Sequence, residues 1–510
     1  MSRRVVDLAV ALAIAAPACA LAGCGSGSAA TAAATGAGAS AVPAQTLAFV
    51  DVNLDRSSTG WRNLQTVGAR IPGWTTLTRQ LLTALAHGSG AGQNFDSAIR
   101  PWLGGEAAVA VTSVDISGGR PHPVVEAYVA VTDPSALERA LTGVGGFTGD
   151  GTRDGYSLYR APASAGSYAA VGSGALLIAS SSAALDQQIS LGGGHGATLA
   201  STGLYRRTLA ALPGGRVLTG FVNTSRIGNL LGLAASIAPG AGGVSAPQIA
   251  RLDQAVASSG SVGLALSADP GGLRAAAVVV PPTATGPAPS GTAAFVPALL
   301  HQVPASTLAY VGTHGSAAAA TAWRAAPSAL SGAARTALEV LGRAAPLFTG
   351  EIGIDATAAP ARGLNVLLTP ADPVAAAAAI NRLVSSLHTW APHAVVRRGP
   401  AGGFVELGKA AAGLPPIGWH RNGGMFVIGT DPAAPPPANS LADAPAFTAL
   451  LAQAGVPTRV TALAYVNVPG LAELAPGSSP ELHALGGLVA WGEVDRNVLV
   501  GEMYLQVPGG

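Results

Sequence analysis

Cysteine is almost absent from this 510-residue sequence. The two that occur, Cys19 and Cys24, lie near the N-terminus in and beside an apolar run. The rest of the chain therefore has no thiol for a disulfide, a zinc–thiolate site or a cysteine nucleophile. A chain of this length can rely on a hydrophobic core, so the lack of disulfides does not argue against an oxidising compartment.

Charged residues are also scarce, at 11% of the chain, and Lys409 is the only lysine. The formal net charge is +2. A nearly neutral chain without a basic stripe gives no electrostatic reason to bind nucleic acid. Hydrophobic residues make up 49% of the sequence, which is far from the composition of disordered chains. We therefore expect a folded protein.

The sequence lacks the motifs that carry common chemistries. It has no H-E-x-x-H zinc motif, no phosphate-binding loop and no G-x-S-x-G nucleophile elbow. GDGTRDG at 149–155 spaces Asp150, Thr152 and Asp154 like calcium ligands, but Ala161 stands where an EF-hand needs glutamate. We expect a hairpin turn there. We predict no metal, no cofactor and no catalytic activity.

The first 23 residues have the layout of an export signal. MSRR is a short basic segment, and a mostly apolar run follows it. After that run come glycine, alanine, serine and threonine rather than the charged segment that would stop transfer through a membrane. We therefore interpret residues 1–23 as a signal peptide, with the export route, general secretory or twin-arginine, left open.

The residues Leu21-Ala22-Gly23-Cys24 resemble the lipobox of bacterial lipoproteins. The resemblance implies that Cys24 carries a diacylglyceryl group and becomes the first residue of the mature chain, which would be labelled by a palmitate analogue. Residues 24–42 would then be a flexible tether of glycine, alanine and serine, reaching roughly 25 Å as a coil. We expect the protein to be anchored on the extracytoplasmic face of the bacterial cell membrane. The alternative is an ordinary secretory signal with an incidental cysteine.

Five sequence blocks occur twice in the same order, at a spacing far longer than a solenoid repeat. The pairs are VPAQTLAFVDVN at 42–53 with VPASTLAYVGTH at 303–314, WLGGEAAVAV at 102–111 with LFTGEIGIDA at 347–356, 126–144 with 364–383, 216–231 with 460–475, and 261–280 with 488–507. We predict two tandem copies of one domain, residues 43–281 and 293–510. A linker rich in proline and glycine, residues 282–292, joins them.

Each copy mixes strand and helix patterns. The block that begins each copy is rich in β-branched and aromatic residues, which predicts a strand. Asp133-Pro134 and Asp372-Pro373 each precede an apolar stripe at helical spacing, which predicts a helix with an aspartate N-cap. DPGG at 269–272 and VDRN at 494–497 predict hairpin turns. The fold class is therefore α+β, a mainly antiparallel sheet in each copy with helices packed on one side.

The segments VPAQTLAFVDVNLD, WLGGEAAVAV and VAVTDPSALERAL resemble a family of bacterial exported proteins catalogued only as a domain of unknown function. Members typically begin with a P-A-x-T-[LV]-A-[YF]-V strand, continue through W-[LF]-G-x-x and have a D-P helix start. The sequence departs from this pattern at Arg56, where a proline is expected. The resemblance covers most of the chain after the tether, and it supplies no catalytic or binding residues.

Glu106 and Glu351 occupy the same place in the two copies, after a glycine at the start of a strand. One interpretation pairs their carboxylates across a cleft between the domains, as a hydrolase would use them. The other has each carboxylate accept backbone N–H groups at a turn. Occurrence in both copies favours the second interpretation, because duplicated domains share the same structural requirements, whereas an active site is seldom repeated in both copies. The two residues remain candidates for ligand binding.

Three classes of function are left. A non-catalytic binding or scaffold protein of the envelope is the first, motivated by the missing chemistry. A carrier or sensor of an apolar ligand such as a lipid is the second, motivated by low charge and high hydrophobicity. A hydrolase using Glu106 and Glu351 is the third. The expected partners are the membrane, through the lipid on Cys24, and an envelope protein or apolar ligand.

Overall fold

One antiparallel sheet of 20 strands runs through the described part of the chain. The computed structural model describes residues 36–76, 99–117, 120–143, 146–161, 167–172, 174–228, 260–283, 293–315, 345–357, 363–390, 394–406, 416–430, 437–474 and 479–509. Cys24 and residues 284–292 of the predicted linker lie outside these ranges.

Each half of the chain contributes ten strands. The first half contains β1 (Ala48–Asn53), β2 (Leu103–Ser117), β3 (Arg120–Val131), β4 (Thr148–Arg153), β5 (Tyr156–Arg160), β6 (Tyr168–Gly172), β7 (Ala175–Ala179), β8 (Arg216–Val222), β9 (Ser261–Asp269) and β10 (Gly272–Val280). The second half contains β11 (Thr307–His314), β12 (Glu351–Thr357), β13 (Gly363–Thr369), β14 (Val395–Arg398), β15 (Gly402–Glu406), β16 (Ile417–Asn422), β17 (Met425–Gly429), β18 (Ala462–Asn467), β19 (Gly487–Asp495) and β20 (Val498–Gln506).

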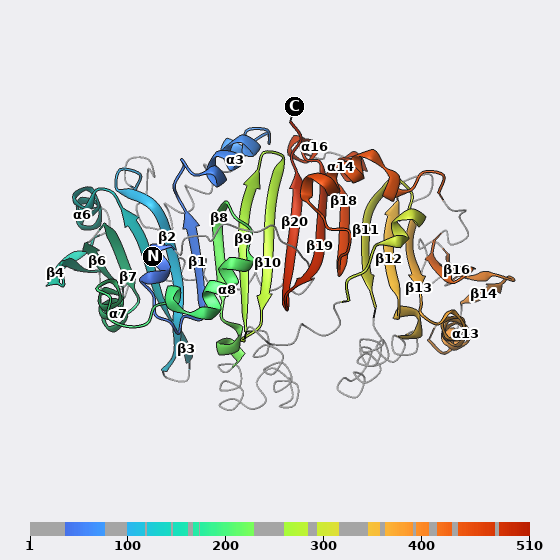
Figure 1. Cartoon of the computed structure of the whole chain (residues 1–510), viewed down its shortest axis with the longest axis horizontal. Coiled ribbons are helices and arrows are strands. Elements are labelled where there is room, and N and C mark those ends of the chain that lie inside the picture. Colours follow the sequence, from blue (N-terminus) through green and yellow to red (C-terminus); the bar gives the residue numbers. More distant parts are fainter. Residues whose placement is uncertain are drawn as a thin grey trace.

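The spatial order of the strands is the same from either edge of the sheet. From one edge it is β4-β5-β6-β7-β3-β2-β1-β8-β9-β10. From the other edge it is β14-β15-β16-β17-β13-β12-β11-β18-β19-β20. Adding ten to a strand number in the first series gives the strand at the same place in the second. The series meet where β10 pairs with β20, in the middle of Figure 1.

The helices and short 3-10 turns fill the connections between strands. They are α2 (Ala37–Ser40), α3 (Thr59–Gly68), α6 (Pro134–Gly143), α7 (Ser182–Gly192), α8 (Gly203–Ala211), α13 (Pro373–Trp390), α14 (Pro445–Ala454), α15 (Val468–Leu474), α16 (Pro480–His483), η1 (Leu199–Ser201), η2 (Ala298–Gln302), η4 (Ala345–Phe348) and η6 (Leu441–Asp443). The described residues therefore form an α+β fold around a large antiparallel sheet.

The local signals that were predicted from the sequence are confirmed. The Asp133 carboxylate accepts a hydrogen bond from the N–H of Ala136 at 2.9 Å, and α6 begins at Pro134. The Asp372 carboxylate accepts from two N–H groups at 2.9 Å each, and α13 begins at Pro373. The β9/β10 and β19/β20 hairpins form where DPGG and VDRN predicted them. Each cap satisfies helix N–H groups that have no partner within the helix.

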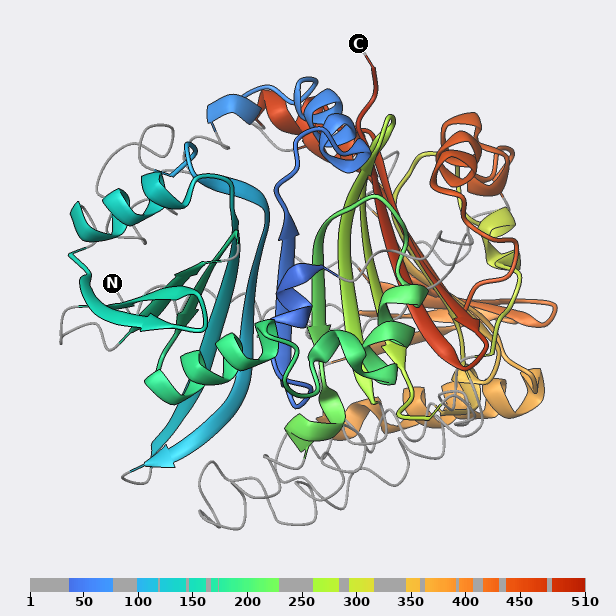
Figure 2. The same cartoon turned by 60° about the vertical axis from the view of Figure 1, so that its left-hand side comes forward.

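One face of the sheet, the helix-covered face, packs against α2, α7 and α8 in the first half and against α14, η2 and η6 in the second (Figures 1 and 2). Aromatic rings form much of this core. Tyr205 of α8 meets Phe49 and Phe221 edge to face, with ring centroids 5.9 and 5.2 Å apart. Phe447 of α14 meets Tyr465 in the same way at 4.9 Å. Such pairs add about 0.5–1.5 kcal/mol beyond burial of their area.

The expectation that helices pack on one side of the sheet is wrong. Helix α6 packs through Leu137 on the opposite face at one end of the sheet, and α13 packs through Ile380 on that face at the other end. The strands beneath them carry consecutive apolar residues, such as Leu176-Leu177 in β7. Because successive side chains of a strand point to opposite faces, both faces need cover there.

The predicted tether 24–42 is also wrong at its C-terminal end. Residues 37–40 form α2, and Ala39 and Val42 are buried in the core. Small residues allow this close approach: a Cβ added to Gly38 would lie 2.5 Å from the Cβ of Ala108. Helix formation by glycine and alanine is thus secured by packing rather than by propensity.

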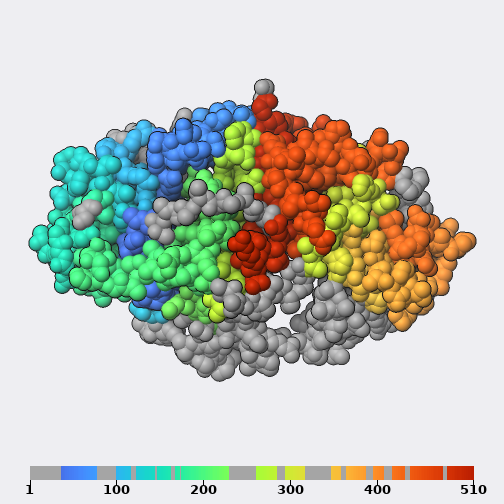
Figure 3. Space-filling model, viewed as in Figure 1, coloured from blue at the N-terminus to red at the C-terminus, as the bar shows by residue number. Residues whose placement is uncertain are grey.

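The two halves join edge to edge at a junction that we call the seam, the β10/β20 pair. Eight residue pairs from Gly272↔Gln506 to Val279↔Leu499 are in register there. Beside it, the Arg70 guanidinium at the end of α3 donates to the carbonyl oxygens of Pro270 at 2.7 Å and Val507 at 3.1 Å. Figure 3 shows the halves as one elongated body.

Candidate functional site

Glu106 holds the N-terminus of α2. Its carboxylate accepts hydrogen bonds from the N–H groups of Ala37 at 2.9 Å and Gly38 at 2.7 Å. Gly36 is needed beside it, because a Cβ there would lie 2.5 Å from the Glu106 carboxylate. A carboxylate at this place is stabilised by unpaired helix N–H groups.

Glu351 makes the same contact in the second half. Its carboxylate accepts from the N–H groups of Ala298 at 3.2 Å and Leu299 at 3.0 Å, at the start of η2. Burial raises the pKa of the Glu351 carboxyl, and the two backbone hydrogen bonds oppose that rise. Glu106 and Glu351 are not brought together, because eight strands lie between β2 and β12.

Asp51 forms a carboxyl pair with Glu106 in the first half only. Burial, the nearby Glu106 charge and a side-chain hydrogen bond to Glu106 raise the pKa of Asp51 to about 7, although Arg216 opposes the rise. In the second half Gly312 stands opposite Leu463 where Asp51 stands opposite Thr219.

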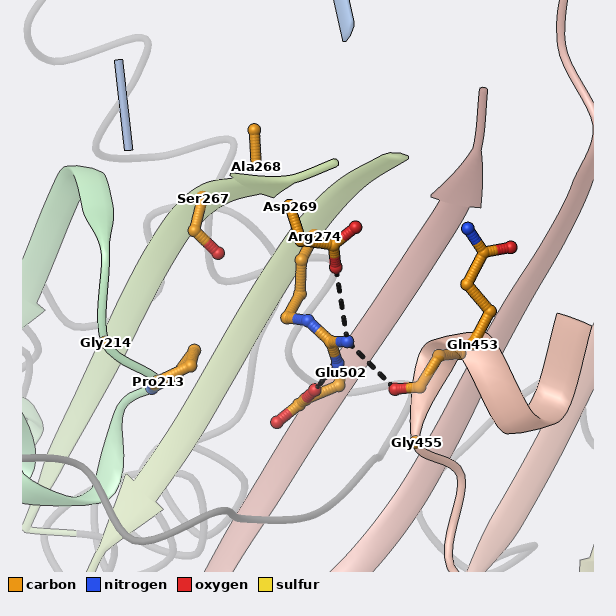
Figure 4. Close-up of a pocket in the computed structure, with 10 residues that line it drawn as sticks. Pro213, Gly214, Ser267, Ala268, Asp269, Arg274, Gln453, Gly455 and Glu502 are labelled. Atoms are coloured by element: carbon orange, nitrogen blue, oxygen red, sulfur yellow. Dashed lines mark hydrogen bonds and ion pairs between the residues drawn. The ribbon is translucent and has the colours of Figure 1, made fainter. Parts of the chain in front are cut away.

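A charged cluster spans the seam on the helix-covered face. Arg274 of β10 forms an ion pair with Glu502 of β20, and its other terminal nitrogen lies 3.6 Å from the Asp269 carboxylate. That nitrogen also donates to the carbonyl of Ala454 at the end of α14, at 2.9 Å. Figure 4 shows the guanidinium between these three acceptors. The cluster therefore ties β9, β10, β20 and α14 together.

Two aromatic rings pack against the Arg274 guanidinium of this cluster. The Arg274 guanidinium carbon lies 5.7 Å from the Trp491 ring centroid and 5.3 Å from that of Tyr504, which is within cation–π range. The Tyr504 hydroxyl donates to the Asp269 carboxylate at 3.1 Å. Burial raises the pKa of Glu502 to about 7, even though Arg274 lowers it. Glu502 is 5% exposed, so the cost of removing its charge from water exceeds the gain from one cation.

A pocket of about 390 Å³ opens above this cluster. We call it the seam pocket; it is lined by Pro213, Gly214, Ser267, Ala268, Asp269, Arg274, Gln453, Ala454, Gly455 and Glu502. The Pro213–Gly214 turn comes from the first half and the end of α14 from the second, on opposite sides in Figure 4. A ligand in the pocket would contact both halves.

The side of the seam that holds the seam pocket differs in its residues from the other side. The β9/β10 turn pairs Asp269 with Gly272, and the β19/β20 turn pairs Asp495 with Val498, so residues 276 and 502 hold the same place in their strands. These two residues also face each other across the seam. On one side of them Arg274 faces Tyr504, whereas on the other Val278 faces Val500, and both valines are buried.

The second notable surface is the opposite face of the central strands, which we call the apolar face. One row of directly opposed residues crosses it: Ala107, Val52, Leu218, Leu266, Ala275, Met503, Ala490, Ala464, Val311, Ile354 and Val366. None of these side chains is fully buried, and Leu266, Met503, Val311 and Ile354 are 37, 42, 49 and 41% exposed.

The ionisable residues of these central strands all lie on the helix-covered face. Asp51, Arg274 and Glu502 are examples, and each sits one position away from a residue of the apolar row. Antiparallel sheets with a solvated face normally alternate apolar and polar residues. Here the partly exposed face is the apolar one, and exposed apolar surfaces are typical of interaction sites.

The other predicted features have structural explanations. GDGTRDG forms the β4/β5 hairpin with Asp154 at φ 48°, and Asp150 pairs with Arg160 at 3.0 Å. The described residues contain no group of three histidine, cysteine or acidic side chains placed to hold a metal ion. Within the same ranges, no helix combines the length and apolar character needed to cross a bilayer.

Sequence reasoning missed both surfaces for identifiable reasons. Arg274 and Glu502 are single charged residues in otherwise apolar strands, LRAAAVVV and LVGEMYL, which was a usable signal. Their meeting depends on the pairing of strands from different halves, which no local pattern specifies. To predict the apolar face, one must know that both faces of these strands carry apolar residues and that helices cover only one of them.

Comparison with known proteins identifies a family whose function is unknown. A family model described as "Protein of unknown function (DUF3352)" matches residues 5–355, about two thirds of the chain. That range covers the first half and continues into β12 of the second. No curated protein matches.

Solved structures of TP0453 resemble part of the chain at low similarity. Crystal form III has 9% identity and a TM-score of 0.26, covering 48% of this chain and 80% of that one. Crystal form IV has 10% identity and a TM-score of 0.27, covering 48% and 79%. Crystal form I has 10% identity and a TM-score of 0.25, covering 48% and 80%. A likeness at this level carries no information about function.

Proposed function

The chain belongs to this family of proteins of unknown function, and we propose that it is a lipid-anchored extracytoplasmic binding protein of the bacterial envelope without catalytic activity. The anchor is the diacylglyceryl group that the lipobox resemblance implies at Cys24, which lies outside the described residues. The partners are the membrane, through that lipid, and an apolar ligand such as a lipid.

We also propose that the folded part is a tandem duplication of one α+β unit, residues 43–281 and 293–510. Three kinds of observation support this. The two strand series have the same order. Glu106 and Glu351 cap the short helices that precede the first strands, α2 and η2. Asn223 and Asn467 each accept an N–H three residues later, at the same turn after β8 and β18.

The observation that carries the binding function is the apolar face. Its row of opposed residues contains no polar side chain, and the backbone groups of the strands beneath are paired with each other. A protein partner typically needs about one hydrogen bond per 100–200 Å² of interface. This surface offers hydrocarbon alone, so the ligand that fits it is an acyl chain, and the second candidate class, the carrier of an apolar ligand, gains support.

The hydrolase alternative has weaker support. Each of the two glutamates is occupied by helix N–H groups, and neither lines the seam pocket. A general acid or base must reach the proton that it transfers. Carboxylates as far apart as those on β2 and β12 cannot act together on the same scissile bond, so in a reaction each glutamate would have to act alone.

A direct test is mass spectrometry of organic extracts from the purified protein. We expect a stoichiometric lipid, and we expect Met503→Glu or Leu266→Glu to abolish its retention, because a charge on the apolar face must be desolvated by an acyl chain. Val374→Glu is the matched control, since Val374 is 72% exposed but lies on α13. A clean extract from folded wild-type protein would remove the carrier function.

A further inference from the structure

We propose that the seam pocket is a second binding site, for a small neutral compound rich in hydroxyl groups, such as a saccharide unit. This site is separate from the acyl-chain site of the proposed function, because Arg274 and Glu502 lie on the helix-covered face and the apolar row lies on the other.

The charges in the pocket are compensated within the protein. Arg274 is 19% exposed and is paired with Glu502 and, at 3.6 Å, with Asp269. An anionic ligand would have to compete with these carboxylates for the guanidinium, and a cationic ligand would have to compete with the guanidinium for the carboxylates. A neutral ligand binds without breaking either contact, and it can use the fixed dipoles of the pair as hydrogen-bond partners.

The remaining polar groups suit hydroxyl groups. The Ser267 hydroxyl and the Gln453 amide both line the pocket, and both can donate as well as accept. Gln453 is oriented because its amide oxygen accepts from the Gln506 side chain at 2.7 Å. Its amide nitrogen is on the side nearer Asp269 in Figure 4. Pro213 and Ala454 supply apolar walls, which match the C–H faces of a sugar ring.

Arg274, Glu502 and Gln453 are not repeated at the matching positions of the other half, which under the proposed duplication separates these three residues from the needs of the fold. Val500 of the second half occupies the position of Arg274. In the first half, Ala276 occupies the position of Glu502 and Ala211 that of Gln453. Those positions are apolar, and the seam still forms there. Arg274, Glu502 and Gln453 are therefore not required to join β10 to β20.

The test is a calorimetric titration of the intact protein, purified in detergent. Glucose, maltose and N-acetylglucosamine are the neutral probes, and glucosamine is the cationic probe. We expect saturable binding of at least one neutral probe, weakened about tenfold by Gln453→Ala, a loss equivalent to one good hydrogen bond. Gln187→Ala is the matched control, because Gln187 is an exposed glutamine of α7 that does not line the pocket.

Three results would overturn the proposal. They are no saturable binding of any neutral probe at millimolar concentration, equal binding by wild-type and Gln453→Ala proteins, and tighter binding of glucosamine than of glucose. Ser267→Ala provides a second variant if Gln453→Ala does not fold. Retention of the extracted lipid is measured on the same preparations, so failure of this site is distinguished from failure of the apolar face.

Discussion

Arg274 and Glu502 form an ion pair across the seam, with one partner from each half of the chain. The pair lies next to the point where residues 276 and 502 face each other as equivalent positions. Polar residues therefore mark one side of a junction whose other side is packed with valine. The valine and alanine found on the other side therefore provide the replacement residues for the double variant described next.

Removing one partner of the Arg274–Glu502 ion pair should destabilise the protein more than replacing both partners. Arg274→Val leaves the Glu502 carboxylate buried without its cation, which costs about 3 kcal/mol of unfolding free energy. The double variant Arg274→Val/Glu502→Ala reproduces the residues found at Val500 and Ala276, so it should recover most of that loss. Urea unfolding of the three proteins measures this. A double variant no more stable than Arg274→Val would show that the charges themselves are not the cause.

Glu106→Gln and Glu351→Gln should each weaken the structure independently. Glutamine keeps one carbonyl acceptor but loses the charge that faces the helix N–H groups, a loss of about 1 kcal/mol in each half. Because eight strands separate the two residues, the effects should add to within about 0.5 kcal/mol. Thermal unfolding of the single and double variants measures the coupling. Strong coupling would contradict the separate roles and revive a shared site.

Stability should fall as pH rises from about 4 to about 7. Burial raises the pKa of Asp51, Glu126 and Glu502 to about 7 in the folded protein, from 3.8 or 4.5 for the free groups. The folded state then binds more protons than the unfolded state in this window. Each group contributes stability that is present at low pH and lost above pH 7, on the order of 3 kcal/mol per group.

Urea unfolding between pH 4 and pH 8 tests this dependence. Glu126→Gln should flatten part of the slope, because the amide keeps the neutral shape and cannot ionise. Glu473→Gln, a substitution at an exposed position of α15, should leave the slope unchanged. A midpoint that rises steadily from pH 4 to pH 7 would show that the buried carboxyls are ionised in the folded state.

Cys24→Ala should release the protein from the membrane. The lipobox resemblance implies that this thiol carries a diacylglyceryl anchor. Membrane fractionation and labelling with a palmitate analogue measure both effects. Substitution of Cys19, in the signal segment, is the control and should change neither. A Cys24→Ala protein that stays membrane-bound and unprocessed would remove the basis of the anchor.

The local structure of this protein could be predicted because its signals are short-range. An aspartate followed by proline sets the start of a helix through two or three nearby atoms, as at Asp133 and Asp372. A turn such as DPGG fixes the register of its own hairpin. The repeat of five blocks in one order likewise required no knowledge of contacts.

What could not be predicted depends on pairing between distant segments. Whether residues 37–40 form a helix is decided by Glu106 and Ala108, about 70 positions away. The Arg274–Glu502 contact spans the two halves, and its partners are unremarkable until β10 and β20 are placed together. Which face of a strand is covered also depends on connections rather than on the strand itself.

The seam has a consequence for the origin of the chain. A chain that ended after β10 would present an unpaired strand edge, and such edges pair with other copies. Two copies of the first half could meet with Ala276 opposite Ala276, in the same register that places Ala276 opposite Glu502 here. Under the proposed duplication, the seam corresponds to the interface of a homodimer carried within one polypeptide. In that case, fusion of the two subunits would free their sequences to diverge, which a symmetric dimer cannot do.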